Sequence, residues 1–170
     1  QLRLDFGAAA DKAPPGFRSA VSGEGKPGKW QVLLDDAPSA LSPLTPGAPA
    51  VSKRAVLAQT ARDATDSHFP LLIYDRETFD DFKITTQFKI VEGAEEQMAG
   101  LAFRIQDERN YYYVRANALG NNFYFFWFVN GELLGPIGSK VPITRGEWHE
   151  MAVECKGTFI TCWLDGKVVI

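Results

Sequence analysis

Residues 111–117 alternate in a way that gathers ring-bearing and hydrogen-bonding side chains on one side of the chain. Positions 111 and 113 are tyrosines, position 115 is an arginine and position 117 is an asparagine. In a β-strand, residues two apart point to the same face. Aromatic rings can stack on the apolar C–H face of a sugar, while arginine and amide groups hydrogen-bond to its hydroxyls. The pattern therefore predicts a strand with a saccharide-binding face, although an ordinary solvent-facing surface explains it about equally well.

Two neighbouring strands could extend this face. Arg104 belongs to the preceding alternating run, 101–105, and can join the tyrosines across a hairpin turn at 106–110. The following run, 123–129, is apolar on both faces, so either its odd or its even positions could lie beside the tyrosines. The odd choice would place Trp127 there. The candidate saccharide-binding residues are Arg104, Tyr111, Tyr113, Arg115, Asn117 and Trp127.

Carboxylates that could serve as acid and base are scattered along the chain. Glycoside hydrolysis needs two carboxyl groups on either side of the scissile bond. No strand carries the Glu-x-Asp-x-Glu array that would line such groups up on one face. Asp107 and Glu108 fall in the predicted hairpin turn, where turn formation explains them better, and residues 95–96 read as a solvated turn. If the protein is catalytic, the candidates for acid and base are Asp107, Glu132 and His68.

The two histidines do not suggest a nucleophilic triad. No serine sits in a nucleophile elbow, and His149, beside Trp148, fits a structural histidine on the core side of its strand. His68, in a loop, is the better functional candidate of the two. Asp and Asn side chains with carbonyl groups could hold Ca²⁺ at the edge of a sandwich, yet no Asp-x-Asp-x-Asp-Gly loop occurs. We therefore expect no cofactor, with calcium as the one metal left open.

Composition narrows the class of partner. The 170 residues include 45% hydrophobic and 23% charged residues and carry a net charge of −3, as in an ordinary soluble protein. Basic residues are scattered, which argues against nucleic acid and against an anionic membrane surface. No apolar run approaches the roughly 20 residues of a membrane span. The length fits a single domain, 1–170, and the absence of an initiator Met at Gln1 suggests a mature or trimmed chain.

Period-two alternation predicts an all-β protein. It is clearest at 82–90, 101–105 and 151–164, and no helical periodicity exceeds about two turns. Four prolines make 37–52 a long surface loop. Many short strands with regular turns predict a two-sheet antiparallel sandwich. Further strands are expected at the N-terminal edge, near Trp30, and at 54–59, 71–74, 111–117, 123–129, 147–156 and 158–165.

Cys155 and Cys162 are expected to be buried, reduced thiols. With the turn at 156–159, both point into the core and are diagonally related across one hairpin. That separation is a little long for an easy disulfide, and unpaired cysteine is commonly buried. Cysteine usage says little about the redox compartment.

Several segments together resemble a known bacterial family. They are GKPGKWQV, TFDDF, AGLAFRIQDERNYYYVRANALGNN, GEWHEMAVECKG and CWLDGK, and they extend from about residue 28 to residue 167. The family consists of concanavalin A-like, laminin G-like jelly rolls labelled putative secreted glycosyl hydrolase or 3-keto-disaccharide hydrolase domain. Members usually continue with another strand pair, so the resemblance implies that the domain lacks its natural C-terminal strands.

The resemblance implies two curved antiparallel sheets with the ligand on the concave face or its rim, in a secreted or periplasmic protein. It favours carbohydrate binding over hydrolysis, because the enzymatic label is a fold-level inference. Our first expectation is thus a carbohydrate-recognition jelly roll with a saccharide ligand and no nucleic acid partner. The alternatives are a glycoside hydrolase or lyase acting on a keto-disaccharide, and a laminin G-like protein-interaction module using the loop at 37–52.

Overall fold

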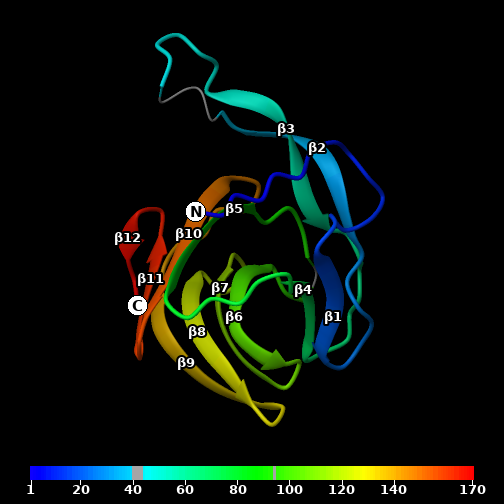
Figure 1. The fold of residues 1–170 in the computed structure, drawn as a ribbon, viewed down its shortest axis with the longest axis vertical. Coiled ribbons are helices and arrows are strands. Elements are labelled where there is room, and N and C mark those ends of the chain that lie inside the picture. Colours follow the sequence, from blue (N-terminus) through cyan, green and yellow to red (C-terminus); the bar gives the residue numbers. More distant parts are fainter. Residues whose placement is uncertain (40–43, 94) are drawn as a thin grey trace.

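The computed structural model describes residues 1–39, 44–93 and 95–170 (Figure 1). All regular secondary structure in this part of the chain is β-strand, and every pairing is antiparallel. The strands are β1 Phe17–Gly23, β2 Trp30–Pro38, β3 Val51–Gln59, β4 His68–Tyr74, β5 Phe82–Lys89, β6 Met98–Asp107, β7 Asn110–Asn117, β8 Asn122–Val129, β9 Glu132–Lys140, β10 Trp148–Lys156, β11 Phe159–Leu164 and β12 Lys167–Val168.

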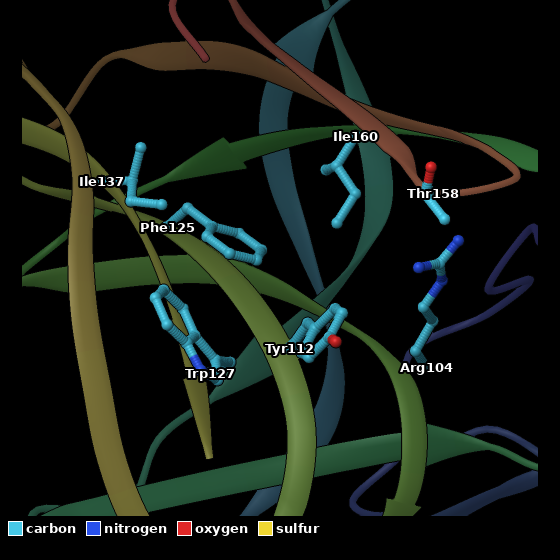
Figure 2. Close-up of a pocket in the computed structure, with 7 residues that line it drawn as sticks. All are labelled: Arg104, Tyr112, Phe125, Trp127, Ile137, Thr158 and Ile160. Atoms are coloured by element: carbon cyan, nitrogen blue, oxygen red, sulfur yellow. The ribbon is translucent and has the colours of Figure 1, made fainter. Parts of the chain in front are cut away.

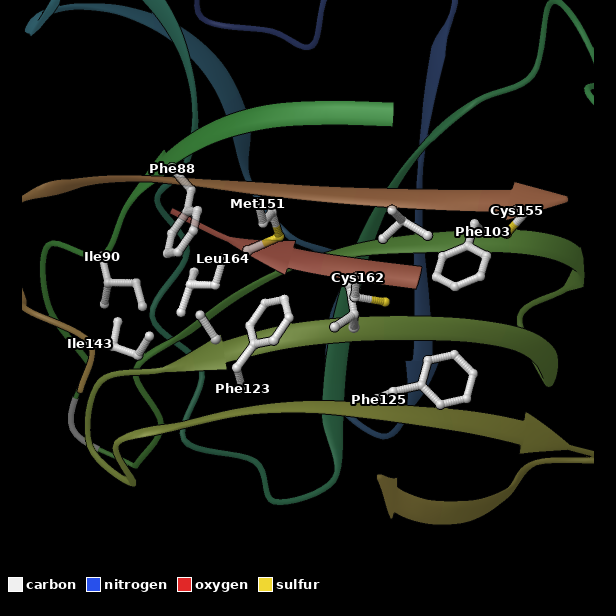
Figure 3. Close-up of a cluster of buried hydrophobic side chains, with 13 residues drawn as sticks. Phe88, Ile90, Phe103, Phe123, Phe125, Ile143, Met151, Cys155, Cys162 and Leu164 are labelled. Atoms are coloured by element: carbon white, nitrogen blue, oxygen red, sulfur yellow. The ribbon is translucent and has the colours of Figure 1, made fainter. Parts of the chain in front are cut away.

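Two four-stranded sheets enclose the main core. One has the order β6-β7-β8-β9 and the other the order β12-β11-β10-β5. Their facing side chains form a single apolar cluster, to which the first sheet contributes Phe123 and Val114 and the second Met151 and Val153 (Figure 3). All four of these side chains are at most 1% exposed. The predicted all-β, two-sheet antiparallel sandwich is confirmed.

A smaller pair of strands covers part of the other side of the β6–β9 sheet. β1 pairs with β4, and the Phe69 ring of β4 lies 5.2 Å from Phe128 and 6.0 Å from Tyr113, both on the side of the sheet that faces away from the main core. We call this side the outer face. β8 is therefore packed on both sides, as its unbroken apolar sequence predicts.

The β2–β3 ribbon is attached to the edge of the second sheet. Trp148 Nε1 donates a 2.8 Å hydrogen bond to the carbonyl of Asp36, and Lys89 forms an ion pair with Asp35. In Figure 1 the far end of the ribbon extends away from the rest of the molecule. The ribbon ends include Ala37 and Ser52, so the predicted proline-rich loop is shorter than expected, and its residues 40–43 lie outside the described part.

Most predicted strands are present, and the differences are local. The expected N-terminal edge strand reduces to one bridge between Ala10 and Val32, while β1 and β9 had not been anticipated. β8 and β9 are joined by a tight turn at Asn130-Gly131, with φ of 54° and 85°, the conformation for which Asn-Gly is suited.

The cysteine prediction is confirmed. Cys155 and Cys162 are fully buried and unbridged. Cys155 pairs with Ile160 and Cys162 with Val153, which is the expected diagonal relation. Burial raises the pKa of Cys162 to about 12 and also raises the pKa of Cys155, so both remain protonated thiols near neutral pH.

Candidate functional site

The outer face carries the alternating residues of β7, as the sequence predicts. The register of β7 against β8 places Tyr113 opposite Phe126, Arg115 opposite Tyr124 and Asn117 opposite Asn122. The even positions of β8 therefore lie beside the tyrosines, which settles the choice that the apolar run had left open. Tyr111, Tyr113, Arg115 and Asn117 do share one face.

One end of this face is closed by β4. Tyr111 is 2% exposed and stacks on Phe128, and Phe69 covers the neighbouring Tyr113. Burial raises the pKa of Tyr111 to about 12. Nearby Ser22 opposes the rise, although the Tyr111 hydroxyl does not reach the geometry of a full hydrogen bond. Burial likewise raises the pKa of Tyr113. Tyr111 is thus a packing residue, and its expected role in binding a saccharide is wrong because its ring is closed off from solvent.

The other end of the face holds a half-buried arginine. Arg115 Nη1 donates a hydrogen bond to Oδ1 of Asn122, which is 9% exposed. The guanidinium also lies 5.1 Å from the ring centre of Phe126 and 5.7 Å from that of Tyr124. Burial lowers the pKa of Arg115, and the nearby Tyr113, Glu96 and Tyr124 oppose that change. Three contacts therefore hold the guanidinium in place.

A glutamate from the segment before β6 lies on the same side. Asn117 Nδ2 donates a 2.8 Å hydrogen bond to Glu96 Oε2, and Asn117 Oδ1 accepts a 2.9 Å bond from the Gly120 amide. Asn117 is 5% exposed, whereas Glu96 is exposed. A buried amide thus orients an accessible carboxylate. Residues 95–96 are exposed and lie outside the strands, as expected, but Glu96 also has a buried partner that no periodicity in this loop could have revealed.

Arg115 and Glu96 are neighbours that do not form an ion pair. Within the described ranges, no carboxylate oxygen lies within 4.0 Å of the Arg115 guanidinium. Gly100 is the β6 residue opposite Arg115, so no side chain of β6 stands beside the arginine there. We call these two residues the Glu96–Arg115 pair. It offers a fork of hydrogen-bond donors beside a hydrogen-bond acceptor, in a frame of aromatic rings.

Arg104 and Trp127 do not join this surface, contrary to expectation. Trp127 pairs with Tyr112 and so belongs to the face of the sheet that is turned toward the other sheet. Regular alternation after Phe103 would put Arg104 on the outer face, but the β6–β7 register shifts between Phe103 and Asp107. Arg104 adopts φ 51° there and its Nη2 donates to the carbonyl of Gly157, in the turn between β10 and β11.

These two residues line a hollow at the end of the sandwich. It measures about 310 Å³, and Figure 2 shows Arg104 and Thr158 on one side, Trp127 on the other and Tyr112 between them. A second hollow of about 290 Å³ also includes Arg104 and Tyr112. Its other lining residues are Gln106, Asn110, Tyr111, Phe128 and Val129.

The three catalytic candidates are spread over different structural roles. Asp107 accepts hydrogen bonds from the Arg109 amide at 2.7 Å and from Asn110 Nδ2 at 2.9 Å, and these bonds lower its pKa. It therefore stabilises the β6–β7 turn. Glu132 is an exposed residue at the start of β9. His68 is the first residue of β4 and pairs with Gly23, so its expected place in a loop is wrong. Its Nε2 lies 2.6 Å from the Lys26 carbonyl, in the connection between β1 and β2.

The second histidine lies against the core of the sandwich. His149 is confirmed as structural, because Nδ1 lies 2.8 Å from Asp165 Oδ2 and the ring stacks on Phe88. Among the described residues, no three His, Cys, Asp or Glu side chains are grouped as they would be around a metal ion. No helix in that part of the chain is long and apolar enough to cross a membrane.

The sequence and the fold were compared with those of known proteins. A family model described as a 3-keto-alpha-glucoside-1,2-lyase-like domain matches residues 16–170. Among solved structures, the carbohydrate-binding module CBM66 from Bacillus subtilis aligns with a TM-score of 0.48 and 19% identity, over 83% of this chain and 76% of that chain. No curated protein sequence gives a match.

Proposed function

The chain belongs to the family of 3-keto-alpha-glucoside-1,2-lyase-like domains, and from that premise we propose that it binds a saccharide at the Glu96–Arg115 pair. The observation that carries the proposal is the separate anchoring of the two groups. Buried Asn117 orients Glu96 and buried Asn122 holds Arg115, yet the two charges are not paired with each other. Desolvating an arginine without an ionic partner costs free energy, and a ligand that accepts its hydrogen bonds would offset that cost.

The chemistry of the pair fits a sugar that bears a carbonyl next to a hydroxyl. The guanidinium of Arg115 donates to the carbonyl oxygen, and the carboxylate of Glu96 accepts from the adjacent hydroxyl. The Tyr124 ring, which is half-buried on the same face, offers a surface for apolar C–H groups. Keto-glucosides of the kind named by the family present this pattern.

A lyase is the second candidate function, and the accessibility of the oriented Glu96 carboxylate favours it. Glu96 would remove the C2 proton, which is acidic because it lies next to the C3 carbonyl. The C2–H electrons then form the C1=C2 double bond as the C1–O bond breaks, and the departing alkoxide takes up a proton and leaves as an alcohol. Arg115 would stabilise the negative charge that develops on the carbonyl oxygen.

Titration calorimetry with methyl 3-keto-α-D-glucopyranoside and methyl α-D-glucopyranoside tests the proposal. Glu96→Gln keeps an oxygen that can accept the Asn117 hydrogen bond, so the fold should be preserved. A lost charged hydrogen bond of about 1.5–3 kcal/mol corresponds to binding weakened by roughly 10- to 150-fold. Glu95→Gln, an exposed neighbour, is the matched control.

The outcomes separate the two functions. Binding that survives Glu96→Gln and Arg115→Lys would place any sugar site elsewhere. Ultraviolet absorbance of a conjugated enone, appearing with the parent protein and absent with Glu96→Gln, would demonstrate the lyase. Tight binding without that absorbance would mean that the protein binds the sugar but does not cleave it.

A further inference from the structure

Arg104 occupies a backbone conformation that an arginine rarely adopts. Its φ of 51° lies in the left-handed region, where the Cβ atom of any residue other than glycine is crowded. The strain sits in the bulged end of β6, where the chain advances from Phe103 to Asp107 while its partner advances only from Asn110 to Tyr112. Bulges and strained residues of this kind cluster beside binding sites, where they re-aim a side chain.

The bulge moves the Arg104 guanidinium from the outer face to the open end of the sandwich. There it donates to the Gly157 carbonyl of the β10–β11 turn and lines both hollows. A glycine at this position would adopt the same turn without strain, so the backbone alone gives no reason for an arginine. We infer that the arginine is present at this strained position because its side chain lies between the two hollows.

The two hollows combine aromatic surfaces with hydrogen-bonding groups. Trp127 and Tyr112 are each half-buried, so part of each ring is open to the space that it lines. The Trp127 ring stacks on Phe125 at 5.7 Å, which fixes its orientation. Thr158 adds a hydroxyl to the first hollow, and Gln106 adds an amide to the second. A lipid would not need these polar groups.

We propose that the two hollows form one oligosaccharide groove, distinct from the Glu96–Arg115 pair, that takes two consecutive pyranose rings on either side of Arg104. Trp127 and Tyr112 stack on the sugar rings, and the Arg104 fork donates to hydroxyls of both. The first hollow, at about 310 Å³, lies at the lower bound of the roughly 300–1,000 Å³ range of ligand pockets, and the second, at about 290 Å³, lies just below it. Because both hollows are lined by Arg104 and Tyr112, they are adjacent. Two linked sugar rings, one in each hollow, therefore fit better than a single ring.

Binding of maltotriose and of cellotriose, an α-linked and a β-linked probe without a keto group, tests this groove. Intrinsic tryptophan fluorescence should change on titration with one of them, and calorimetry should give the same dissociation constant. Arg104→Gly removes the guanidinium together with the backbone strain, so the variant should melt within a few degrees of the parent while binding at least tenfold more weakly. Trp127→Leu should weaken binding to a similar extent and should abolish most of the fluorescence change.

Two control variants test whether the effects on trisaccharide binding are specific to the groove. Ser67→Gly relieves another positive φ, 53°, in a turn that lines neither hollow, and it should leave trisaccharide binding unchanged. Glu96→Gln should also bind the trisaccharide as the parent does. The proposal is overturned if neither probe binds at about 10 mM, a concentration that would saturate a site with a dissociation constant near 1 mM. It is equally overturned if Arg104→Gly and Trp127→Leu bind as tightly as the parent.

Discussion

Asn117 Nδ2 lies 2.8 Å from Glu96 Oε2, so a side chain that is 5% exposed determines where an accessible carboxylate points. The Oδ1 atom of the same side chain accepts a hydrogen bond from the backbone amide of Gly120. Asn117 Oδ1 therefore stabilises the turn after β7, while Asn117 Nδ2 contacts the surface that we propose to bind sugar. This double engagement couples the stability of the β7–β8 turn to the geometry of the Glu96–Arg115 pair.

Asn117→Ala should affect stability and binding together. The lost cap on Gly120 should lower the free energy of unfolding by about 1–2 kcal/mol, the scale of a hydrogen bond whose partner is left unsatisfied. The released Glu96 should weaken binding of the keto-glucoside, although the carboxylate itself is intact. Chemical denaturation and calorimetry measure the two effects. Unchanged binding in a destabilised protein would show that Asn117 serves the fold alone.

Arg115→Ala should lower the stability of the fold as well as the affinity for the keto-glucoside. The mutation leaves Asn122, which is 9% exposed, without its donor and removes the contacts with Phe126 and Tyr124. We expect a loss of about 1–3 kcal/mol by urea unfolding. Arg115→Lys should recover part of this stability, because the charge remains over the rings, but not the binding that needs a planar fork. Equal stability of the alanine variant and the parent would mean that the contacts with Asn122, Phe126 and Tyr124 contribute nothing to folding.

The strand faces could be predicted from the sequence, because a period of two assigns every second residue of 82–90 and 111–117 to the same side. The position of Arg104 could not, because the bulge after Phe103 interrupts the alternation and nothing in the local sequence marks it. Trp127 was undecidable for a different reason. Its strand is covered by the second sheet on one side and by Phe69 on the other, so both of its faces are apolar.

Glu96 was missed because its role arises from a contact between a loop and a strand that are distant in sequence. Alternation predicts the face on which its partner Asn117 lies, but only the fold brings the loop before β6 over that face. Loops have no periodicity, so sequence reasoning sees their charges simply as solvated. The site was therefore half predictable: the arginine and the asparagine from alternation, the carboxylate only from the structure.

Neither cysteine should react with a thiol reagent while the protein is folded. Burial raises the pKa of Cys162 to about 12, so almost no thiolate is present at pH 8, and both sulfurs are inaccessible. Labelling with iodoacetamide followed by mass spectrometry should show no adduct in buffer and two adducts in about 6 M guanidinium. Rapid modification of the native protein would mean that the β10–β11 hairpin opens readily.

Asp63 should contribute to stability above its unfolded pKa and lose that contribution in acid. Hydrogen bonds from Thr65 and from the Lys26 amide lower the folded pKa of Asp63 from 3.8 to about 2. Because the folded pKa is the lower one, stability is gained fully above about pH 4 and is lost as the pH falls toward 2. Melting curves of Asp63→Asn and of the parent should therefore converge over this range. Curves that stay parallel would exclude the effect.

Asp107→Ala should destabilise the β6–β7 turn rather than remove a catalytic group. Three donor–acceptor contacts, from the Arg109 amide and from Asn110 Nδ2, converge on this carboxylate. Asn110 Oδ1 in turn accepts a 2.9 Å bond from the Asn130 amide, so the effect should spread to the neighbouring β8–β9 turn. We expect melting at a lower temperature with binding of the keto-glucoside unchanged once the protein is folded, whereas Glu132→Ala, at an exposed position, should alter neither. Hydrogen exchange at the Arg109 and Asn130 amides should accelerate in Asp107→Ala alone. If Asp107→Ala instead retains the parent melting temperature and loses enone formation from the keto-glucoside, Asp107 is the catalytic acid or base and Glu96 is not sufficient for that chemistry.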